Sequence, residues 1–456
     1  MVETVGTTNP HVLPSVPRSP LPRAQIITAL RAYHTGIEKL RDAGGYVTRA
    51  VIAPKWLVPP VVVVTSPQGA RDVLGRTGTR IDKTRIHDEV RNIIGSNLFD
   101  LKHEPWIARR RAIQPVFTKK HVRDFAGHMA QAADTVAKSW TSEAVVDIDA
   151  ECRRLTLQAL GRSVLGLDLD ERSEDLGDAL QISLGYAADR AGRPVRAPRW
   201  LPTRARRRAV AARDLLHRQA AEILRLCRED PTRDAPLVHA LIAATDPLTG
   251  RPLADKDIRD ELVVFLLAGH DTTATTLSYA LWALGRHPDM QEKVYREVAQ
   301  FGDRELTPED LPRLEYTTMV LHESLRLCPP GAVIARAALQ DVEVDGHLVE
   351  AGTMLIVGVY AMHRDPALWD DPVTFSPDRF TPGQRKARDR WQYLPFGAGP
   401  RSCIGDHFAM LEATLALATI VRRVEVESVQ ADFPIDVPFT VVAAQPVLAG
   451  VRARKA

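Results

Sequence analysis

The sequence predicts a mainly α-helical protein with a minor β-sheet region, folded as one large domain. Helical periodicity dominates from about Glu104 to Arg326, whereas residues 341–358 have a β-type pattern around an Asp345-Gly346 turn. Strands do not alternate regularly with helices, which excludes a dinucleotide-binding fold with a parallel sheet. A length of 456 residues allows roughly three domains. No Gly/Ser linker or internal repeat divides the chain, so we expect one domain.

The first half of the chain supplies one clear strand and several helices. Residues 25–43 have helical periodicity, and Val61–Val64 is typical of a short buried strand that ends at Ser66-Pro67. The pattern from Asp255 to Arg286 predicts a helix of about 30 residues and about 45 Å, long enough to cross a domain. Gly269 lies in its middle and costs about 1 kcal/mol relative to alanine. We therefore expect a loosened turn there.

Proline and glycine mark the boundaries of elements in the second half. A helix around Tyr316–Leu327 ends before Pro329-Pro330. The Asp345-Gly346 pair predicts a hairpin, and Met354–Val359 supplies a further strand. The tail from Val424 mixes short β-type pieces with prolines. Together these elements give the predicted minor sheet region.

Composition and charge indicate an ordinary globular protein. The chain is 45% hydrophobic and 26% charged, and its net charge of +3 is too small to indicate nucleic-acid binding. Residues 1–23 are rich in proline and are expected to be a mobile tail, which leaves residues 24–456 as the domain. No segment predicts a signal peptide or a membrane span. Four well-separated cysteines favour a reducing compartment with one functional thiol, and we expect a cytoplasmic protein.

The segment Phe396–Gly405 places one cysteine between glycines, directly before an apolar run with helical periodicity. Cys403 is therefore predicted at a helix N-terminus, where free N–H groups and the helix dipole favour a thiolate. A thiolate held in this way is a good axial ligand for haem iron. Gly399 and Gly405 would leave room for a flat macrocycle, and Arg401 could reach a haem propionate. A packing cysteine at a glycine-rich turn is the alternative interpretation.

The segment Ala268–Thr273, in the middle of the long predicted helix, combines Gly269 with an acid and hydroxyl side chains. The hydroxyls can bond the carbonyl four residues earlier and so loosen the turn further. A widened turn beside Thr272 would seat dioxygen and a water, and Asp271 would link this site to solvent protons. Solvated polar residues on a long helix are the alternative interpretation. His270 is expected to be structural or to contact a water, and not to ligate iron.

The cysteine loop resembles the haem-binding loop of the cytochrome P-450 superfamily at its signature positions, which are Phe396, Gly399, Arg401, Cys403 and Gly405. The segment Ala268–Thr273 resembles that family's oxygen-activation motif, and the resemblance extends from about residue 40 to the end of the chain. The resemblance implies the cytochrome P-450 fold, with a long central helix over a haem b. It also implies Cys403 as the metal ligand, and Asp271 and Thr272 as the catalytic pair that delivers protons.

The resemblance further assigns side chains around the cofactor and the substrate. It implies propionate-binding positions at Trp106, Arg110, Arg336 and Arg401, with His103 as a further candidate where much of the family has glycine. It implies a charged triad that braces the fold beneath the cysteine loop, formed by Glu323, Arg326 and Arg379. The expected substrate contacts are Phe265, Ala268, Thr272, Val333, Ile334 and Val441-Val442.

The resemblance implies a haem-thiolate monooxygenase that inserts one atom of dioxygen into an apolar small molecule, namely an acyl chain, terpenoid, steroid or polyketide. The segment after Cys403 is too short for a fused reductase, so we expect electrons from a ferredoxin and an NAD(P)H-dependent reductase. Two alternatives stay open: a peroxide-driven haem-thiolate oxidase or isomerase, and a non-catalytic haem- or ligand-binding protein. The presence of Asp271-Thr272 argues against the peroxide-driven alternative.

Two clusters of basic residues indicate possible partners. The first cluster comprises Arg385, Lys386, Arg388 and Arg390, together with Arg109, Arg111, Lys119 and Lys120. We expect Arg109 and Arg111 to point to solvent, and the cluster to dock an acidic ferredoxin. The second cluster comprises Arg190, Arg193, Arg196, Arg199, Arg204, Arg206, Arg207 and Arg208. It falls where the family has a mobile lid, and it suggests an anionic or carrier-bound substrate, or contact with acidic lipid headgroups.

Overall fold

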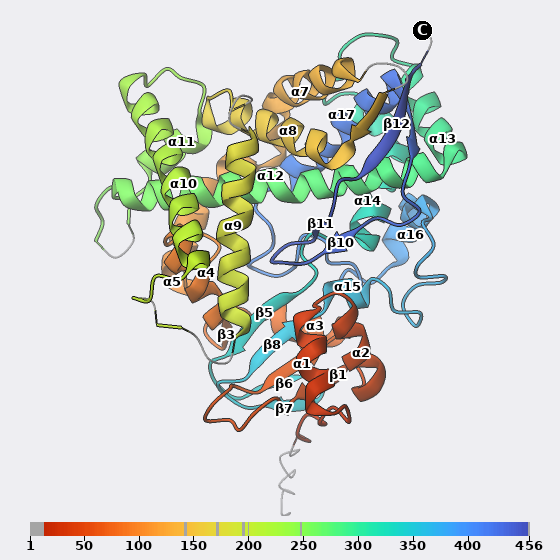
Figure 1. Cartoon of the computed structure of the whole chain (residues 1–456). Helices are drawn as coiled ribbons and strands as arrows, with labels where there is room; N and C mark the ends of the chain where they lie inside the picture. Colours follow the sequence, from red (N-terminus) through yellow and green to blue (C-terminus); the bar gives the residue numbers. More distant parts are fainter. Residues whose placement is uncertain are drawn as a thin grey trace, which may run out of the picture.

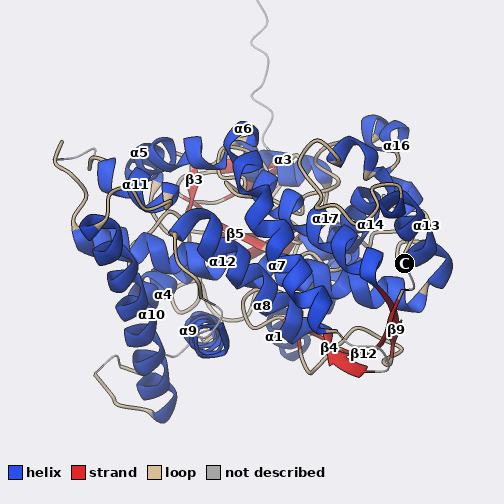
Figure 2. Ribbon diagram, turned by 90° about the horizontal axis from the view of Figure 1, so that it is seen from above, coloured by secondary structure: helices blue, strands red, loops and turns tan. Residues whose placement is uncertain are grey.

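The computed structural model describes residues 13–140, 144–169, 173–193, 197–198, 200–246 and 249–454. Helices form most of the structure, and the largest sheet lies at one end of the molecule (Figures 1 and 2). The predicted mainly α architecture with a minor β region is therefore confirmed. Residues 1–12 of the predicted tail, and Arg196 and Arg199 of the second basic cluster, lie outside the described residues. The rest of that tail contacts the sheet region, because Leu348 N–H donates to the carbonyl of Pro14 at 2.9 Å.

The helices follow one another through the whole chain. They are α1 (Arg23–Arg31), α2 (Thr35–Gly44), α3 (Pro67–Gly75), α4 (Arg85–Ile94), α5 (His103–Ile113), α6 (Lys119–Val122), α7 (Ala126–Ser139), α8 (Ile148–Leu160), α9 (Ser173–Gly192), α10 (Arg204–Glu229), α11 (Pro236–Ala243), α12 (Asp255–Arg286), α13 (Pro288–Ala299), α14 (Glu315–Leu327), α15 (Val359–Met362), α16 (Pro382–Ala387) and α17 (Asp406–Arg423). The helix predicted over residues 25–43 is thus split into α1 and α2. Within the described ranges, no helix is both long and apolar enough to cross a lipid bilayer.

The strands form one sheet of five strands and three smaller sheets of two or three strands. The five-stranded sheet has the order β1 (Val47–Ala50), β2 (Val61–Val64), β8 (Met354–Val357), β5 (Ile334–Ala338), β3 (Ile81–Asp82), and only the β2–β8 pair in it is parallel. The predicted hairpin is β6 (Val342–Val344) and β7 (His347–Val349), with φ of 48° at Asp345 and 74° at Gly346 in its turn. The remaining pairings join β4 (Ala144–Asp147), β12 (Leu448–Ala453) and β9 (Val424–Ser428), and β10 (Ile435–Asp436) with β11 (Val442–Ala443).

The long helix α12 crosses the helical part of the molecule, and α8 packs along it (Figure 1). It is continuous through Gly269, so the predicted loosened turn is not found. Gly269 instead lets α8 approach closely, because a Cβ at this position would lie 2.7 Å from Leu160 Cδ1. Thr272 Oγ1 does donate to the carbonyl of Ala268 at 2.8 Å. This bond is accommodated within the helix and does not open it.

A buried ion pair between Glu323 and Arg326 joins α14 to the chain that follows α15. Both side chains are 0% exposed, and the guanidinium donates to the carboxylate through Nε at 2.7 Å and Nη2 at 2.8 Å. It also donates to the carbonyl oxygens of His363 at 2.7 Å, Pro372 at 2.6 Å and Thr374 at 3.2 Å. These bonds satisfy the guanidinium on every side, which a charge in the protein interior requires.

Arg379 completes the predicted triad. Its Nε lies 3.5 Å from Glu323 Oε1, and its Nη2 donates to the carbonyl of Asp371 at 2.8 Å. The N–H of Ser376 donates to the same Glu323 oxygen at 2.8 Å. The structure therefore brings Glu323, Arg326 and Arg379 together around one carboxylate.

We predict that Arg326→Met lowers the free energy of unfolding by about 3–5 kcal/mol, because Glu323 would be left buried with only the longer contact to Arg379 as a counter-charge. Urea unfolding followed by circular dichroism measures this loss. The matched control is Arg296→Met, which breaks an exposed pair with Glu292 at 3.0 Å and should cost less than about 1 kcal/mol. Equal losses in the two variants would contradict a structural role for the buried pair.

Candidate active site

The loop before α17 presents Cys403 at one wall of a cavity. The N–H of Cys403 donates to the carbonyl of Phe396 at 2.9 Å, and Gly405 caps the N-terminus of α17. Gly399 has φ of 74°, and a Cβ there would lie 2.2 Å from the carbonyl oxygen of Leu74, so this glycine lets the loop pack on α3. A Cβ at Gly405 would meet no atom within 4 Å. Of the two glycines predicted to make room for a macrocycle, only Gly405 has open space in front of it.

The ionisation of Cys403 differs from the simple expectation for a helix N-terminus. Burial raises the pKa of its thiol, while the Gly405 N–H and the Arg110 guanidinium act in the opposite direction. Cys403 has exposed surface and lines the cavity, so we conclude that this surface faces the cavity and not the bulk solvent. The local N–H groups alone do not favour a free thiolate here. Coordination to a metal ion would deprotonate the thiol.

The cavity between Cys403 and α12 has a volume of about 450 Å³. The predicted substrate contacts that line it are Phe265, Ala268, Thr272, Val333 and Ile334. Val441 does not line it, contrary to the prediction, because its backbone bonds to Pro330 and Thr275 hold it in the core at 0% exposure. Residues 438–440 line the cavity in its place.

Four of the predicted cofactor residues line the same cavity, namely Trp106, Arg110, Arg336 and Arg401. The guanidinium carbon of Arg401 lies 4.3 Å from the centroid of the Trp106 ring, and that of Arg110 lies 6.0 Å from it. Arg401 is also paired with Asp82 at 2.9 Å. The indole therefore holds two cations at the cavity wall.

His103, the further cofactor candidate, is not among the residues that line this cavity. Its N–H donates to Asp82 Oδ2 at 3.1 Å, and a Cβ at Gly78 would lie 3.1 Å from its ring Cε1. Its Nδ1 is buried without a hydrogen-bond partner. A role for His103 in cofactor binding stays a prediction.

Cationic side chains line the cavity, and no carboxylate among the described residues lines it with them. Lys83, which the sequence analysis missed, lines it with its ammonium 4.5 Å from the Phe99 ring centroid. Burial, and then the nearby Arg336 and Arg401, lower the pKa of Lys83 well below its usual value. Burial and Arg401 also lower the pKa of Arg336 to about 10, and Arg401 Nε is buried without an acceptor. The two carboxylates of a haem would supply the missing charge and acceptors, so the residues present fit a haem.

Asp271 is held by two helices and by one loop residue outside α12. Its Oδ1 accepts hydrogen bonds from Arg153 of α8 and, at 2.7 Å, from Gln181 Nε2 of α9. Its Oδ2 accepts a hydrogen bond from Thr440 Oγ1 at 2.6 Å. Asp271 is 2% exposed and does not line the cavity, whereas Thr272 and Thr440 do. The carboxylate is thus separated from solvent, and the Thr440 hydroxyl connects it to the cavity.

His270 is buried on the side of α12 that faces α9. A Cβ at Gly177 would lie 3.4 Å from its ring Cε1, and the ring does not line the cavity. Burial lowers the pKa of His270 to about 4, so the imidazole is neutral at pH 7. This environment supports the expectation that His270 has a structural role.

Two members of the first basic cluster are engaged within the protein. Arg109, expected to point to solvent, is 9% exposed and forms an ion pair at 2.6 Å with Glu261 of α12. Arg388 stacks on Trp369, with 4.4 Å from its guanidinium carbon to the ring centroid, and donates to the carbonyl of Arg379 at 2.6 Å. Neither side chain is therefore available to a docking partner.

His363, also missed by the sequence analysis, connects the buried ion pair to the cysteine loop. Burial, with smaller effects of Arg326 and Arg364, lowers its pKa to about 3, so its imidazole is neutral. Its Nε2 accepts the N–H of Leu394 at 2.9 Å, which leaves Nδ1 to donate to the carbonyl of Arg326 at 3.2 Å. The segment that leads into the Cys403 loop is thereby fixed to α14.

Comparison with known proteins places this site in a family. The family model described as Cytochrome P450 matches residues 24–449. Cyclooctat-9-en-7-ol 5-monooxygenase of Streptomyces melanosporofaciens is 33% identical over 344 residues, covering 75% of this chain and 75% of that protein. Cyclooctatin synthase of the same organism is 32% identical over 367 residues, covering 80% of each chain. The crystal structure of the cytochrome P450DA haem domain superposes with a TM-score of 0.85 at 25% identity, covering 98% of this chain and 99% of that one.

The chain belongs to the cytochrome P450 family. It is a cytochrome P450 monooxygenase with a haem cofactor, and the fold implied by the resemblance of its cysteine loop is confirmed. The long helix α12 and the loop of Cys403 are the two elements that face each other across its cavity.

The neutral state of His363 predicts how acid affects the fold. Its pKa is about 3 in the folded protein against an ordinary value of 6.5, so the unfolded chain binds a proton first as the pH falls. We expect the free energy of unfolding to decrease from about pH 6.5 towards pH 3, and less steeply in His363→Asn. Urea unfolding at several pH values measures this slope.

The control for this prediction is His121→Gln, whose imidazole is exposed and should leave the slope unchanged. His322, with a pKa of about 3 for the same reason of burial, contributes to the slope in all three proteins. A wild-type slope in His363→Asn would contradict the proposed neutral imidazole.

Proposed function

We propose that this cytochrome P450 inserts one atom of dioxygen into an apolar small molecule held between α12 and Cys403. The observation that carries the proposal is that Cys403, Thr272 and a set of cationic side chains line one cavity. The rest of its lining is mostly nonpolar, which favours a nonpolar substrate beside a flat anionic cofactor.

We propose haem b as the cofactor, with Cys403 as the ligand of its iron. When bound, the haem supplies an iron centre that activates dioxygen. The residues that would bind its propionates are Lys83, Trp106, Arg110, Arg336 and Arg401. His103 would act on them only through Asp82, which accepts its backbone N–H and pairs with Arg401. The open space in front of Gly405 is consistent with a flat ring at this position.

Thr272 at the cavity wall and Asp271 behind it are proposed to hold and move protons. Thr272 Oγ1 donates to the Ala268 carbonyl at 2.8 Å, so its lone pairs can accept a hydrogen bond from a water in the cavity. Asp271 accepts from the Thr440 hydroxyl at 2.6 Å, and Thr440 lines the cavity. A proton can therefore pass between Asp271 and the cavity through Thr440. Arg153 holds the carboxylate in position as its counter-charge.

A separate ferredoxin, reduced by an NAD(P)H-dependent reductase, is the proposed electron donor. The members of the first basic cluster that are exposed are Arg111, Lys119, Lys120, Arg385, Lys386 and Arg390. These side chains attract an acidic surface and would raise the rate of association at low ionic strength. Arg109 and Arg388 are left out of this set because they are engaged in contacts within the protein.

The substrate classes expected from the sequence all fit a nonpolar cavity: acyl chains, terpenoids, steroids and polyketides. One relative is named as a cyclooctat-9-en-7-ol 5-monooxygenase, which supports a nonpolar substrate for this chain. A peroxide-driven reaction is the weaker alternative, because the acid and the threonine of the proton path are both in place.

The test is a turnover experiment with labelled dioxygen. The haem-loaded protein is incubated with ferredoxin, reductase, NADPH, ¹⁸O₂ and a panel of nonpolar compounds that includes cyclooctat-9-en-7-ol and long-chain acids. We expect a product that contains one labelled oxygen atom, detected by mass spectrometry. Oxygen derived from water, or equal turnover with hydrogen peroxide alone, would contradict the proposal.

We predict that Thr272→Val lowers the product formed per NADPH consumed by about 10²-fold, because a positioned group that takes part in proton transfer contributes about that much. The matched control is Thr276→Val, which removes another hydroxyl that lines the cavity and bonds the carbonyl four residues earlier. This control should keep most of the wild-type yield. Similar losses in both variants would remove the special role of Thr272.

A further inference from the structure

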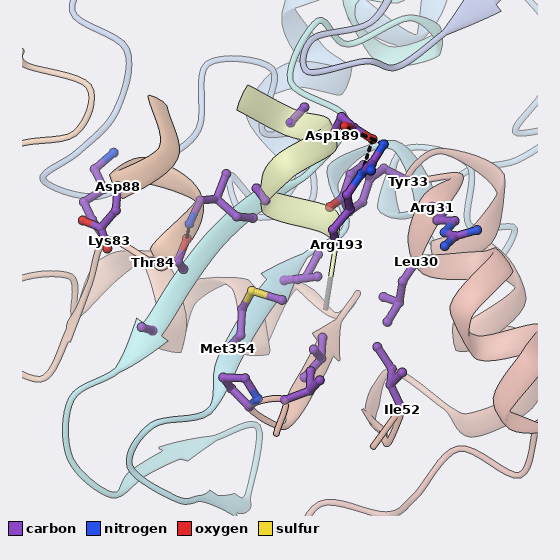
Figure 3. Close-up of a pocket in the computed structure, with 18 of the residues that line it drawn as sticks. Leu30, Arg31, Tyr33, Ile52, Lys83, Thr84, Asp88, Asp189, Arg193 and Met354 are labelled. Carbon is purple, nitrogen blue, oxygen red and sulfur yellow. Dashed lines mark hydrogen bonds and ion pairs between the residues drawn. The ribbon is translucent and has the colours of Figure 1, made fainter. Parts of the chain in front are cut away.

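The first turn of α4 lies between two cavities. Thr84, the N-cap of this helix, lines a larger cavity of about 1390 Å³ between α1, the five-stranded sheet and the end of α9 (Figure 3). His87, three residues later, does not line that cavity. It lines instead the cavity of about 450 Å³ between Cys403 and α12, which we call the Cys403 cavity. The His87 ring therefore extends from Thr84 towards the Cys403 cavity.

The Nδ1 atom of His87 caps the N-terminus of α4. It accepts the backbone N–H of Thr84 at 3.1 Å, and Thr84 Oγ1 accepts the N–H of Ile86 at 3.2 Å. This arrangement is a capping box, in which the side chain of the third helical residue reaches back to the N-cap. A backbone N–H can only donate, so Nδ1 has a free lone pair and carries no proton.

The imidazole of His87 is neutral at pH 7. Burial, and then the nearby Lys83 and Arg336, lower the pKa of His87 well below its usual value. A neutral imidazole has one N–H, and Nδ1 does not carry it, so the proton is on Nε2. The capping bond to Thr84 thus fixes which nitrogen can donate.

The Nε2 atom of His87 faces the Cys403 cavity from an aromatic wall. No described residue makes a hydrogen bond to Nε2, and this atom is not sealed inside the protein. The residue is only 4% exposed and lines the Cys403 cavity, so we conclude that Nε2 is accessible from there. The His87 ring lies 5.1 Å from the Phe99 ring, which lies 5.8 Å from that of Phe439, and both phenylalanines line the same cavity.

Three of the threonine hydroxyls that line the Cys403 cavity donate within the protein. Thr272 Oγ1 donates to the Ala268 carbonyl at 2.8 Å, and Thr276 Oγ1 donates to the Thr272 carbonyl at 3.0 Å. Thr440 Oγ1 donates to Asp271 at 2.6 Å. The cationic side chains of the lining are directed to the carboxylates of the proposed cofactor. The Nε2–H group of His87 is therefore an uncharged donor that stays free for a ligand.

We propose that His87 is a specificity-determining residue that donates a hydrogen bond from Nε2 to an oxygen atom of the substrate. The inference rests on the proposed oxidation of a nonpolar molecule and narrows its class. The expected substrate has a nonpolar body that carries a carbonyl, ether or hydroxyl oxygen. A pure hydrocarbon is disfavoured, because it would leave the N–H of His87 unpaired in a nonpolar wall.

The experiment compares two ligands of the same shape, cyclododecanone and methylenecyclododecane, which differ only in C=O against C=CH₂. Their dissociation constants for the haem-loaded protein are measured from the change in the haem absorption spectrum. The readout is the affinity for the ketone divided by the affinity for the alkene. Comparing this ratio between variants cancels the cost of removing the carbonyl from water. We expect the ratio to fall about tenfold in His87→Leu, as for one hydrogen bond to a buried acceptor.

His87→Gln separates the N–H group from the rest of the imidazole. Glutamine is a usual capping-box residue, so its Oε1 can accept the Thr84 N–H while its Nε2 donates to the ligand. This variant should keep most of the wild-type ratio. In His87→Leu the lost capping bond affects both ligands alike and leaves the ratio unchanged. The matched control is His239→Leu, which removes a partly buried imidazole of α11 that lines neither cavity and should have the wild-type ratio.

An unchanged ratio in His87→Leu, or a fall of the same size in His87→Gln or His239→Leu, would overturn the inference. Loss of haem from His87→Leu with an unchanged ratio would overturn it in favour of a bond from His87 to a haem carboxylate. Failure of the proposed function is seen separately, in the incorporation of labelled oxygen. A ratio that depends on His87 without any labelled product keeps the donor site and removes the monooxygenase proposal. Labelled products with an unchanged ratio have the opposite meaning.

Discussion

The position of Cys403 depends on the buried ion pair between Glu323 and Arg326. The carbonyl of Arg326 accepts a hydrogen bond from His363, and His363 accepts one from the N–H of Leu394 at the start of the cysteine loop. The ion pair, the neutral imidazole and the loop therefore form one connected network across three segments of the chain. Because an unpaired charge in the interior is costly, each member has one stable arrangement. This network anchors the segment just before the loop and so limits where the Cys403 thiol can lie.

Burial of charged and ionisable groups around Cys403 costs free energy that the other residues of the site do not offset. Lys83 and Arg336 are positive charges held in a buried space, and burial opposes ionisation of the Cys403 thiol. The carboxylates and the metal ion of a haem remove these costs together. Binding of the cofactor and stability of the fold are linked for this reason.

Short motifs of consecutive residues were enough to predict two parts of the site. The loop of Cys403 and the segment of Thr272 were both found from their own residues, and the structure places them around one cavity. Contacts between distant segments could not be predicted in this way: Arg109 pairs with a carboxylate 152 positions away, and Asp271 with a hydroxyl 169 positions away. Val441 was misplaced because the resemblance locates the C-terminal segment only approximately, and the backbone bonds that bury Val441 join it to distant segments. The cavity of about 1390 Å³ that residues of α1, the five-stranded sheet and α9 line draws on several distant segments, so no single motif indicates it.

The central claim is that Cys403 ligates the iron of a haem as a thiolate. The most direct measurement is the difference spectrum of the reduced, haem-loaded protein with carbon monoxide. The account predicts a thiolate-type band for the wild type and its loss in Cys403→Ser, with haem still retained by the cationic residues. A wild type without this band, or a Cys403→Ser variant that keeps it, would contradict the account.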